Sequence, residues 1–159
     1  MQKRRVVITG IGAISPLGLD ALSTWENIAK GKSGIGPITK FDASSLTARV
    51  AGEVDPLFNP ENYIEPRDVR KMDIFIQYGI AASTEAILDS RWKPESEEDF
   101  ERTGVMLGSG IGGLKAVEEA AISLHSGGRV GPYFIPSCLI NLLSGHVSIK
   151  HGYLSLIHI

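Results

Sequence analysis

A glycine-rich stretch, GSGIGG at residues 108–113, most constrains how this chain of 159 residues can fold. It follows the apolar run Val105–Leu107 and precedes a segment with helical spacing, so it predicts a strand, a tight turn and a helix. Read as G-x-G-x-x-G, the glycines match a loop that holds the pyrophosphate of a dinucleotide. That interpretation also requires an acidic residue about 20 positions later to bind the ribose, and no Asp or Glu follows Glu119. The alternative is steric, because glycines permit unusual dihedral angles and the close approach of another segment.

Two further glycine motifs resemble phosphate-binding loops and fail a similar test. Gly10 and Gly12 follow a short apolar run, but Ser15 stands where a third glycine is needed. The triplet GKS at residues 31–33 resembles the end of a P-loop, yet Glu26 occupies the place of its first glycine. The sequence therefore disfavours a nucleotide-binding domain, and we predict no cofactor.

The hydrophobic pattern elsewhere alternates between short buried strands and amphipathic helices, which predicts an α/β layered fold. We expect strands at residues 6–8, 49–52 and 103–107, and helices at 20–31, 68–87, 114–124 and 136–147. Residues 31–66 contain Pro37, Pro56, Pro60 and Pro66 and lack periodicity, so a long irregular segment is predicted there. The acidic stretch PESEEDFE at residues 94–101 is predicted to be a solvated loop.

Composition excludes several classes of function. The net charge of -2 gives no basic field for nucleic acid or for a membrane surface. No apolar run is long enough to span a membrane as a helix. The single cysteine, Cys138, allows neither an internal disulfide nor a cysteine-based zinc site, which is typical of a reducing compartment. We therefore expect a cytoplasmic location.

Cys138 is also a candidate nucleophile, with His125, His146 or His151 as its base. It lies within the apolar stretch SCLINLL, however, where a cysteine behaves as a small hydrophobic residue, so we expect it to be buried and structural. The histidines show neither an HExxH motif nor an i, i+4 pair, and no metal site is predicted.

Three cations, Arg67, Arg70 and Lys71, cluster at the predicted start of a helix. The helix macrodipole disfavours positive charge at that end. The cluster is either an ordinary solvated face or a docking surface for an acidic partner.

Five stretches carry a joint pattern along most of the chain. They are VVITGIGAISPLG at 6–18, SGIGPITKFD at 33–42, RKMDIFIQYGIAAS at 70–83, GVMLGSGIGGL at 104–114 and PYFIPSCLINLLSGHVSIKHG at 132–152. In this order they resemble the N-terminal part of a beta-ketoacyl-acyl carrier protein synthase, the type II condensing enzyme of bacterial fatty acid synthesis. The resemblance covers about residues 3–152.

The resemblance implies a thiolase-like fold of two similar α/β halves, which works as a homodimer and of which this chain supplies most of the first half. It implies elongation of acyl chains by decarboxylative condensation with malonyl-acyl carrier protein, through a cysteine thioester. The implied partners are acyl carrier protein and the acyl and malonyl thioester substrates.

The resemblance also assigns roles to five residues. Ile111 matches a bulky side chain that gates the acyl pocket, and Phe134 matches a residue that lines this pocket near the dimer interface. Arg67, Arg70 and Lys71 fall on the patch that docks the acyl carrier protein. The family's nucleophilic cysteine and its two histidines have no counterpart here, so no catalytic residue is assigned and we expect the chain itself to be inactive.

We divide the chain into residues 1–152, the N-terminal half of a ketosynthase, and residues 153–159, YLSLIHI, a tail that does not continue the family pattern and that we expect to be artefactual. Two alternatives stay open. One is a polyketide-type ketosynthase, against which Ile111 and the RKMDIFIQYG match favour the fatty acid type. The other is a non-catalytic piece that binds acyl carrier protein.

Overall fold

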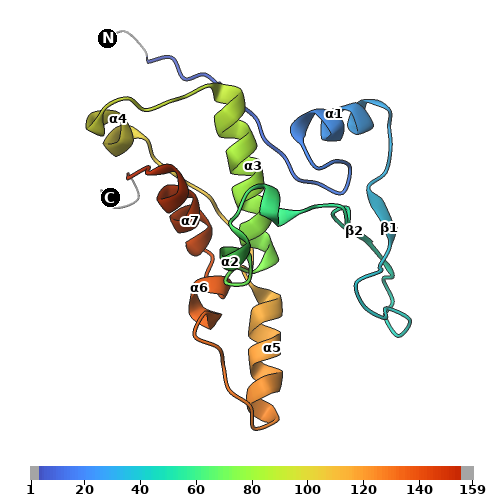
Figure 1. Ribbon diagram of the computed structural model, residues 1–159. Coiled ribbons are helices and arrows are strands. Elements are labelled where there is room, and N and C mark those ends of the chain that lie inside the picture. The colour runs from blue at the N-terminus through green and yellow to red at the C-terminus, as the bar shows by residue number, and fades with distance from the viewer. Residues whose placement is uncertain (1–3, 155–159) are drawn as a thin grey trace. The chain divides into compact units, whose positions relative to one another are not determined.

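The computed structural model describes residues 4–154, which form two compact units that are described separately below (Figure 1). The first unit runs to Asn59 and adds Ala82–Arg91, and the second comprises Pro60–Ala81 and the chain from Trp92 onward. The long helix α3, Ile74–Ser90, contributes residues to both. None of the helices in this part of the chain is long and apolar enough to cross a membrane.

The first unit contains helix α1, Ala21–Ala29, and a two-stranded antiparallel sheet of β1, Ile35–Pro37, and β2, Val50–Gly52. Helix α1 begins as predicted at its N-cap Asp20, whose carboxylate accepts the amide N–H of Ser23 at 2.6 Å. The expected strand at residues 49–52 corresponds to β2.

Glycines and the carboxylates of Glu85 and Asp89 hold the N-terminal loop against α3 within this unit. A Cβ atom added to Gly10 or Gly12 would collide with backbone carbonyl oxygens of α3, so only glycine allows this approach. Glu85 accepts the amide N–H groups of Ala13 and Ala21, each at 2.8 Å. Gly10 and Gly12 therefore have a packing role that needs no bound phosphate.

The second unit is built from short helices around one apolar cluster. Its elements are η1, Pro60–Asn62; α2, Pro66–Val69; the first half of α3; α4, Glu97–Arg102; α5, Leu114–His125; α6, Phe134–Cys138; and α7, Leu142–His151. The buried residues of the cluster are Ile64, Ile76, Ile80, Leu143 and Val147. Gly79 lies so close to Leu143 that a Cβ there would collide with the leucine side chain, which explains a small residue at this point of α3.

Two predicted strands, at residues 6–8 and 103–107, do not form, so these predictions were wrong. A strand needs a hydrogen-bonded neighbour, and within residues 4–154 neither segment has one. Their side chains are correspondingly exposed, with Val6 at 93% and Met106 at 96%.

Two predicted helices are each divided in the structure. The segment at 68–87 splits into α2 and α3, and Asp68 lies inside α2 instead of opening a helix. The segment at 136–147 splits into α6 and α7, because Leu139 adopts an extended conformation with ψ at 135°. The helix predicted at 114–124 is confirmed as α5.

The acidic stretch predicted as a loop contains helix α4 instead. Ser96 and Asp99 form a capping box at its start, in which each side chain accepts from the backbone of the other residue. The acidic residues of the first turn also complement the helix macrodipole. Residues 155–159, most of the predicted tail, lie outside the described residues.

Candidate functional site: a glycine turn, a basic cluster and a cavity

The glycine turn at residues 108–113 packs against the end of α6 on one side only. Gly113 donates its N–H to the carbonyl of Cys138 at 3.0 Å. Gly112 has φ of +81°, and a Cβ there would lie 2.5 Å from the same carbonyl oxygen. A Cβ on Gly113 would lie 2.7 Å from the Cα of Cys138. These two glycines are thus required for a close backbone approach, as the steric interpretation predicts.

The other half of the turn is open. A Cβ atom added to Gly108 or Gly110 would meet no atom of the described part of the chain within 4 Å. Ile111, the predicted gate of an acyl pocket, lies between the two halves with 70% of its surface exposed. Ile111 does not line the cavity between α5 and the segment that leads into α6.

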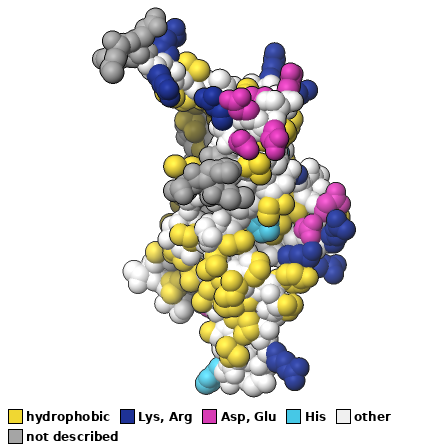
Figure 2. All heavy atoms as spheres, turned by 90° about the vertical axis from the view of Figure 1, so that its left-hand side faces the viewer, with side chains coloured by type: hydrophobic (Ala, Val, Ile, Leu, Met, Phe, Trp, Pro, Cys, Tyr) yellow, Lys and Arg dark blue, Asp and Glu magenta, His cyan; other side chains and the backbone are white. Residues whose placement is uncertain are grey.

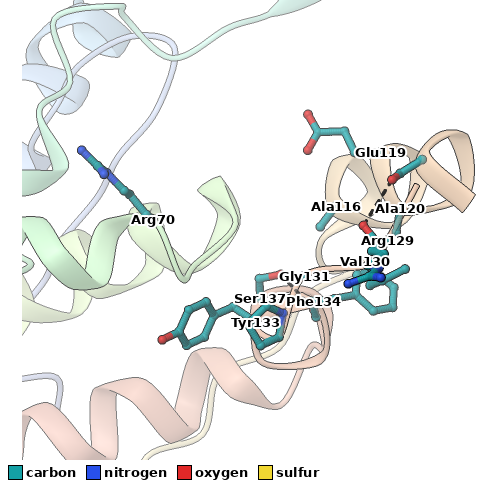
Figure 3. Close-up of a pocket in the computed structure, with 12 residues that line it drawn as sticks. Arg70, Ala116, Glu119, Ala120, Arg129, Val130, Gly131, Tyr133, Phe134 and Ser137 are labelled. Carbon is teal, nitrogen blue, oxygen red and sulfur yellow. Dashed lines mark hydrogen bonds between the residues drawn. The ribbon is translucent and has the colours of Figure 1, made fainter. Parts of the chain in front are cut away.

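A cavity of about 350 Å³ lies between the end of α2, helix α5 and the segment that leads into α6 (Figure 3). Its lining comprises Arg70, Ala116, Glu119, Ala120, Ser123, Arg129, Val130, Gly131, Pro132, Tyr133, Phe134 and Ser137. Phe134 and Arg70 therefore border one space, although the sequence assigned them to different roles. In Figure 3 Arg70 lies apart from the α5 side chains, and its guanidinium group points away from them.

Helix α2 presents the three predicted docking cations at its C-terminal end. Arg67 lies in its last turn, Arg70 is its C-cap residue, and Lys71 follows. Arg67 is the second of the four residues of α2 and Lys71 lies three residues before α3, so the cluster lies between two helices and not at the start of one long helix. The side chain of Arg67 is 82% exposed, with Asp68 at 3.8 Å. Arg70 makes no ion pair with any residue from 4 to 154.

Lys71 is held more firmly than the two arginines. Its Nζ atom donates to the carboxylate of Asp68 at 2.6 Å and lies 5.5 Å from the centroid of the Tyr133 ring. The hydrogen bond with Lys71 lowers the pKa of Asp68, and the same bond raises the pKa of Lys71. Tyr133 is half-exposed and directly precedes Phe134, so Lys71 connects the basic cluster to the edge of the cavity.

The alternative nucleophile is buried, as predicted. Cys138 is 9% exposed and its thiol contacts the carbonyl of Ile135 at 3.7 Å. The Nε2 atoms of His146 and His151 are buried and have no hydrogen-bond partner among residues 4–154. Burial lowers the pKa of both imidazoles. Among the described residues, no group of three metal-ligating side chains comes together.

Sequence reasoning missed two residues that organise this region. Tyr133 contacts Lys71, and Asp73 accepts the amide N–H of Ala116 at 3.2 Å. The motif RKMD places Asp73 directly after the cations, but its partner lies 43 residues away, and sequence spacing gives no sign of that contact.

Exposed apolar side chains surround this region as well. Ile111, Leu114, Ile122, Ile135 and Ile140 each expose about half of their surface or more. Figure 2 shows hydrophobic side chains gathered in the lower part of the view, where α5 and α6 lie in Figure 1. A patch of this kind is typical of a surface that meets another protein segment.

A solved structure with the same fold defines the class of protein. The chain aligns with a ketosynthase that was determined in complex with its type II polyketide acyl-carrier protein, bound to the hexaketide, with a TM-score of 0.76 and 29% identity. The alignment covers 96% of this chain and 40% of that chain. The fold is therefore the thiolase-like fold of the ketosynthases, and the predicted fold class is confirmed.

Residues 3–154 match the family described as beta-ketoacyl synthase, N-terminal domain, and the chain belongs to this family. It is 44% identical over 156 residues to the 3-oxoacyl-[acyl-carrier-protein] synthase 2 of Rhizobium meliloti (strain 1021), covering 93% of this chain and 37% of the relative. It is 45% identical over 154 residues to the synthase 2 of Vibrio cholerae serotype O1 (strain ATCC 39315 / El Tor Inaba N16961), covering 96% and 37%. The chain thus spans well under half of the length of these relatives.

Proposed function

We propose that the chain is the N-terminal part of a 3-oxoacyl-acyl carrier protein synthase of the type II fatty acid pathway. The observation that carries the proposal is the match across residues 3–154, together with 44% and 45% identity to two synthases of that name. The polyketide-type alternative has weaker support, because the polyketide ketosynthase is 29% identical.

The proposed reaction joins an acyl group to a malonyl unit. The acyl group is held as a thioester on a cysteine, and malonyl-acyl carrier protein loses CO₂ to give a carbanion that attacks the thioester carbonyl. The carbon–sulfur bond breaks, the cysteine thiolate takes up a proton, and 3-oxoacyl-acyl carrier protein leaves. Backbone amides stabilise the negative charge that develops on the carbonyl oxygen.

The residues of this chain would bind and orient the reactants. Ile111 and Phe134 are proposed to border the acyl pocket, and Arg67, Arg70 and Lys71 to dock the acidic carrier protein. The placement of Arg70 and Phe134 on one cavity supports this proposal, because a docked carrier must deliver its acyl group near its docking site. Homodimerisation through the exposed apolar surface is also proposed, as is a cytoplasmic location.

Charge reversal of Arg70 tests the docking proposal most directly. Arg70 has no ion pair to lose within residues 4–154, so Arg70→Glu should weaken carrier-protein binding without unfolding the chain. The matched control is Arg102→Glu on α4, an exposed cation paired with Glu98. Calorimetric titration with acyl carrier protein should show a loss of about tenfold or more for Arg70→Glu alone. Equal affinity of both variants would remove the docking proposal.

We further propose that the 159-residue chain does not catalyse condensation by itself. No described residue combines an accessible thiol with a partner base, and Cys138 is buried. The purified chain, incubated with acyl- and malonyl-acyl carrier protein, should release no CO₂ above the buffer rate. Any release of CO₂ above the buffer rate would contradict the proposed inactivity. If Cys138→Ala abolished that release, Cys138 would be the nucleophile.

A second function has one specific observation in its favour. The arginines of α2 are available on the surface of this chain without the rest of a synthase, since Arg67 is 82% exposed. The chain could then bind acyl carrier protein without chemistry. The same titration tests this second function, which requires only that the chain by itself binds acyl carrier protein.

A further inference from the structure

The glycine turn is fixed at one end and free at the other. Gly112 and Gly113 are pressed against Cys138, whereas Gly108 and Gly110 face open space. Ile111 lies at the junction of the two halves. The position of this side chain therefore depends on what holds Gly112 and Gly113.

Asp73 makes a second contact with the fixed end of the turn, beside Gly113. Its Oδ2 atom accepts the amide N–H of Ala116 at 3.2 Å, in the first turn of α5. The same oxygen lies 3.1 Å from the point where a Cβ of Gly113 would stand. The N-cap residue of α5 is Gly113, which has no side chain to cap the helix. A carboxylate from a distant part of the chain thus takes over the capping role, which the helix macrodipole also favours.

Asp73 is itself held rigidly. Its backbone carbonyl accepts the N–H of Ile76 at 3.1 Å at the beginning of α3. The buried side chain of Gln77 donates to the carbonyl of Met72 at 2.9 Å and so anchors the residue next to it. Because the backbone around Asp73 is anchored in this way, its side chain can hold the first turn of α5 in one position.

We propose that Asp73 is the positioning residue for the turn that carries Ile111. It fixes the start of α5, so that conformational freedom is confined to the half of the turn from Gly108 to Ile111. The inference rests on the proposed function only in taking Ile111 as an acyl-pocket residue. Asp73 lies two residues after Lys71, so its hydrogen bond to Ala116 also links the docking cations to the turn that carries Ile111.

Amide hydrogen exchange on the purified chain tests the proposal. Asp73→Ala should speed exchange at Ala116 about tenfold, the effect of losing one charge-assisted hydrogen bond. Asp73→Asn should retain most of the protection, because its amide oxygen still accepts. The matched control is Asp99→Ala, which removes a capping carboxylate from α4 and should leave Ala116 unaffected. Unchanged exchange at Ala116 in Asp73→Ala, or faster exchange spread evenly over the chain, would overturn the proposal.

A measurement on the unaltered chain covers the case in which Asp73→Ala does not fold. Exchange at the Ala116 amide should be slower than in an unfolded peptide of the same sequence, because the Asp73 carboxylate accepts its N–H. Exchange at the rate of the unfolded peptide would overturn the proposal.

The complete condensing enzyme separates this inference from the proposed function. Asp73→Ala should change the ratio of kcat/KM between long and short acyl thioesters several-fold, whereas Asp99→Ala should not change it. If exchange at Ala116 responds but this ratio does not, the positioning role stands and the acyl-pocket role of Ile111 fails.

Discussion

The ammonium group of Lys71 lies 5.5 Å from the centroid of the Tyr133 ring while its Nζ atom donates to Asp68 at 2.6 Å. Both contacts arise within the second unit, so they join the end of α2 to the segment that enters α6. An acidic partner that recruits Lys71 must compete with a carboxylate and an aromatic face. The lysine is therefore the least available of the three predicted docking cations, and the two arginines are expected to dominate binding.

Removing the Tyr133 ring should weaken this connection. Tyr133→Leu is expected to lower the free energy of unfolding by about 0.5–1 kcal/mol, the usual size of an exposed cation–π contact. Tyr133→Phe keeps the ring and should match the unaltered chain. Chemical denaturation of both variants, combined with Lys71→Met in a double-mutant cycle, measures the coupling. A coupling energy of zero would show that the two side chains are neighbours without an energetic interaction.

The two half-buried histidines predict a loss of stability in mild acid. Burial lowers the folded-state pKa of His146 and His151 below the ordinary value of 6.5, so the unfolded chain binds more protons just below that pH. Their contribution is therefore fully present above pH 6.5 and is lost as the pH falls toward the depressed values. Thermal unfolding between about pH 7 and 5 should show a falling melting temperature.

Substitution separates the histidines from the carboxylates in that experiment. His146→Gln should flatten the pH dependence of the melting temperature, because it removes one of the two imidazoles with a lowered pKa. The pKa values of Asp20, Asp68 and Asp99 are lowered from 3.8, so these groups act only in stronger acid. A slope that persists in a His146→Gln, His151→Gln double variant would refute the assignment.

Glu85 is predicted to hold the N-terminal loop of the first unit. Glu85→Ala removes the acceptor of two amide N–H groups, those of Ala13 and Ala21, and should destabilise the chain by about 2–4 kcal/mol. Glu85→Gln keeps one acceptor oxygen and should show an intermediate loss. The control is Glu26→Ala, which breaks only the exposed pair with Lys30 and should cost less than about 0.5 kcal/mol. Amide exchange at Ala13 and Ala21 should rise in Glu85→Ala, and equal exchange would contradict the role.

Local signals in the sequence predicted the elements that need no distant partner. Helix α1 follows from Asp20 and the spacing of its apolar residues, and α5 from the segment after the glycine turn. The strands at 6–8 and 103–107 were wrong because β-structure depends on a neighbouring strand, which no described residue provides. The helix breaks near Asp73 and Leu139 depend on contacts distant in sequence, such as the hydrogen bond between Asp73 and Ala116.

The candidate site shows the same division. The basic cluster and the glycine turn are visible as motifs, and the resemblance assigned them roles. The placement of Phe134 and Arg70 on one cavity, and the contact of Lys71 with Tyr133, depend on how the segment after α2 lies against the segment that enters α6. Pattern and propensity carry no information about such pairs, because they are set by tertiary contacts.

Two glycines of the glycine turn, Gly112 and Gly108, should respond differently to substitution by alanine. Gly112→Ala forces a side chain into φ of +81° and places its Cβ 2.5 Å from the Cys138 carbonyl oxygen, so it should destabilise the chain by about 2–4 kcal/mol. Gly108→Ala adds a methyl group to open space and should change the free energy of unfolding by less than about 0.5 kcal/mol.

Urea denaturation of the two variants side by side gives the comparison, with equal m-values as the check that both unfold in the same way. A dinucleotide loop would need Gly108, the first glycine of G-x-G-x-x-G, whereas the packing role needs only Gly112, which meets Cys138. Equal destabilisation by the two substitutions would mean that Gly108 also has a close neighbour. The half of the turn from Gly108 to Ile111 would then not be open, and the difference between the two halves would fail.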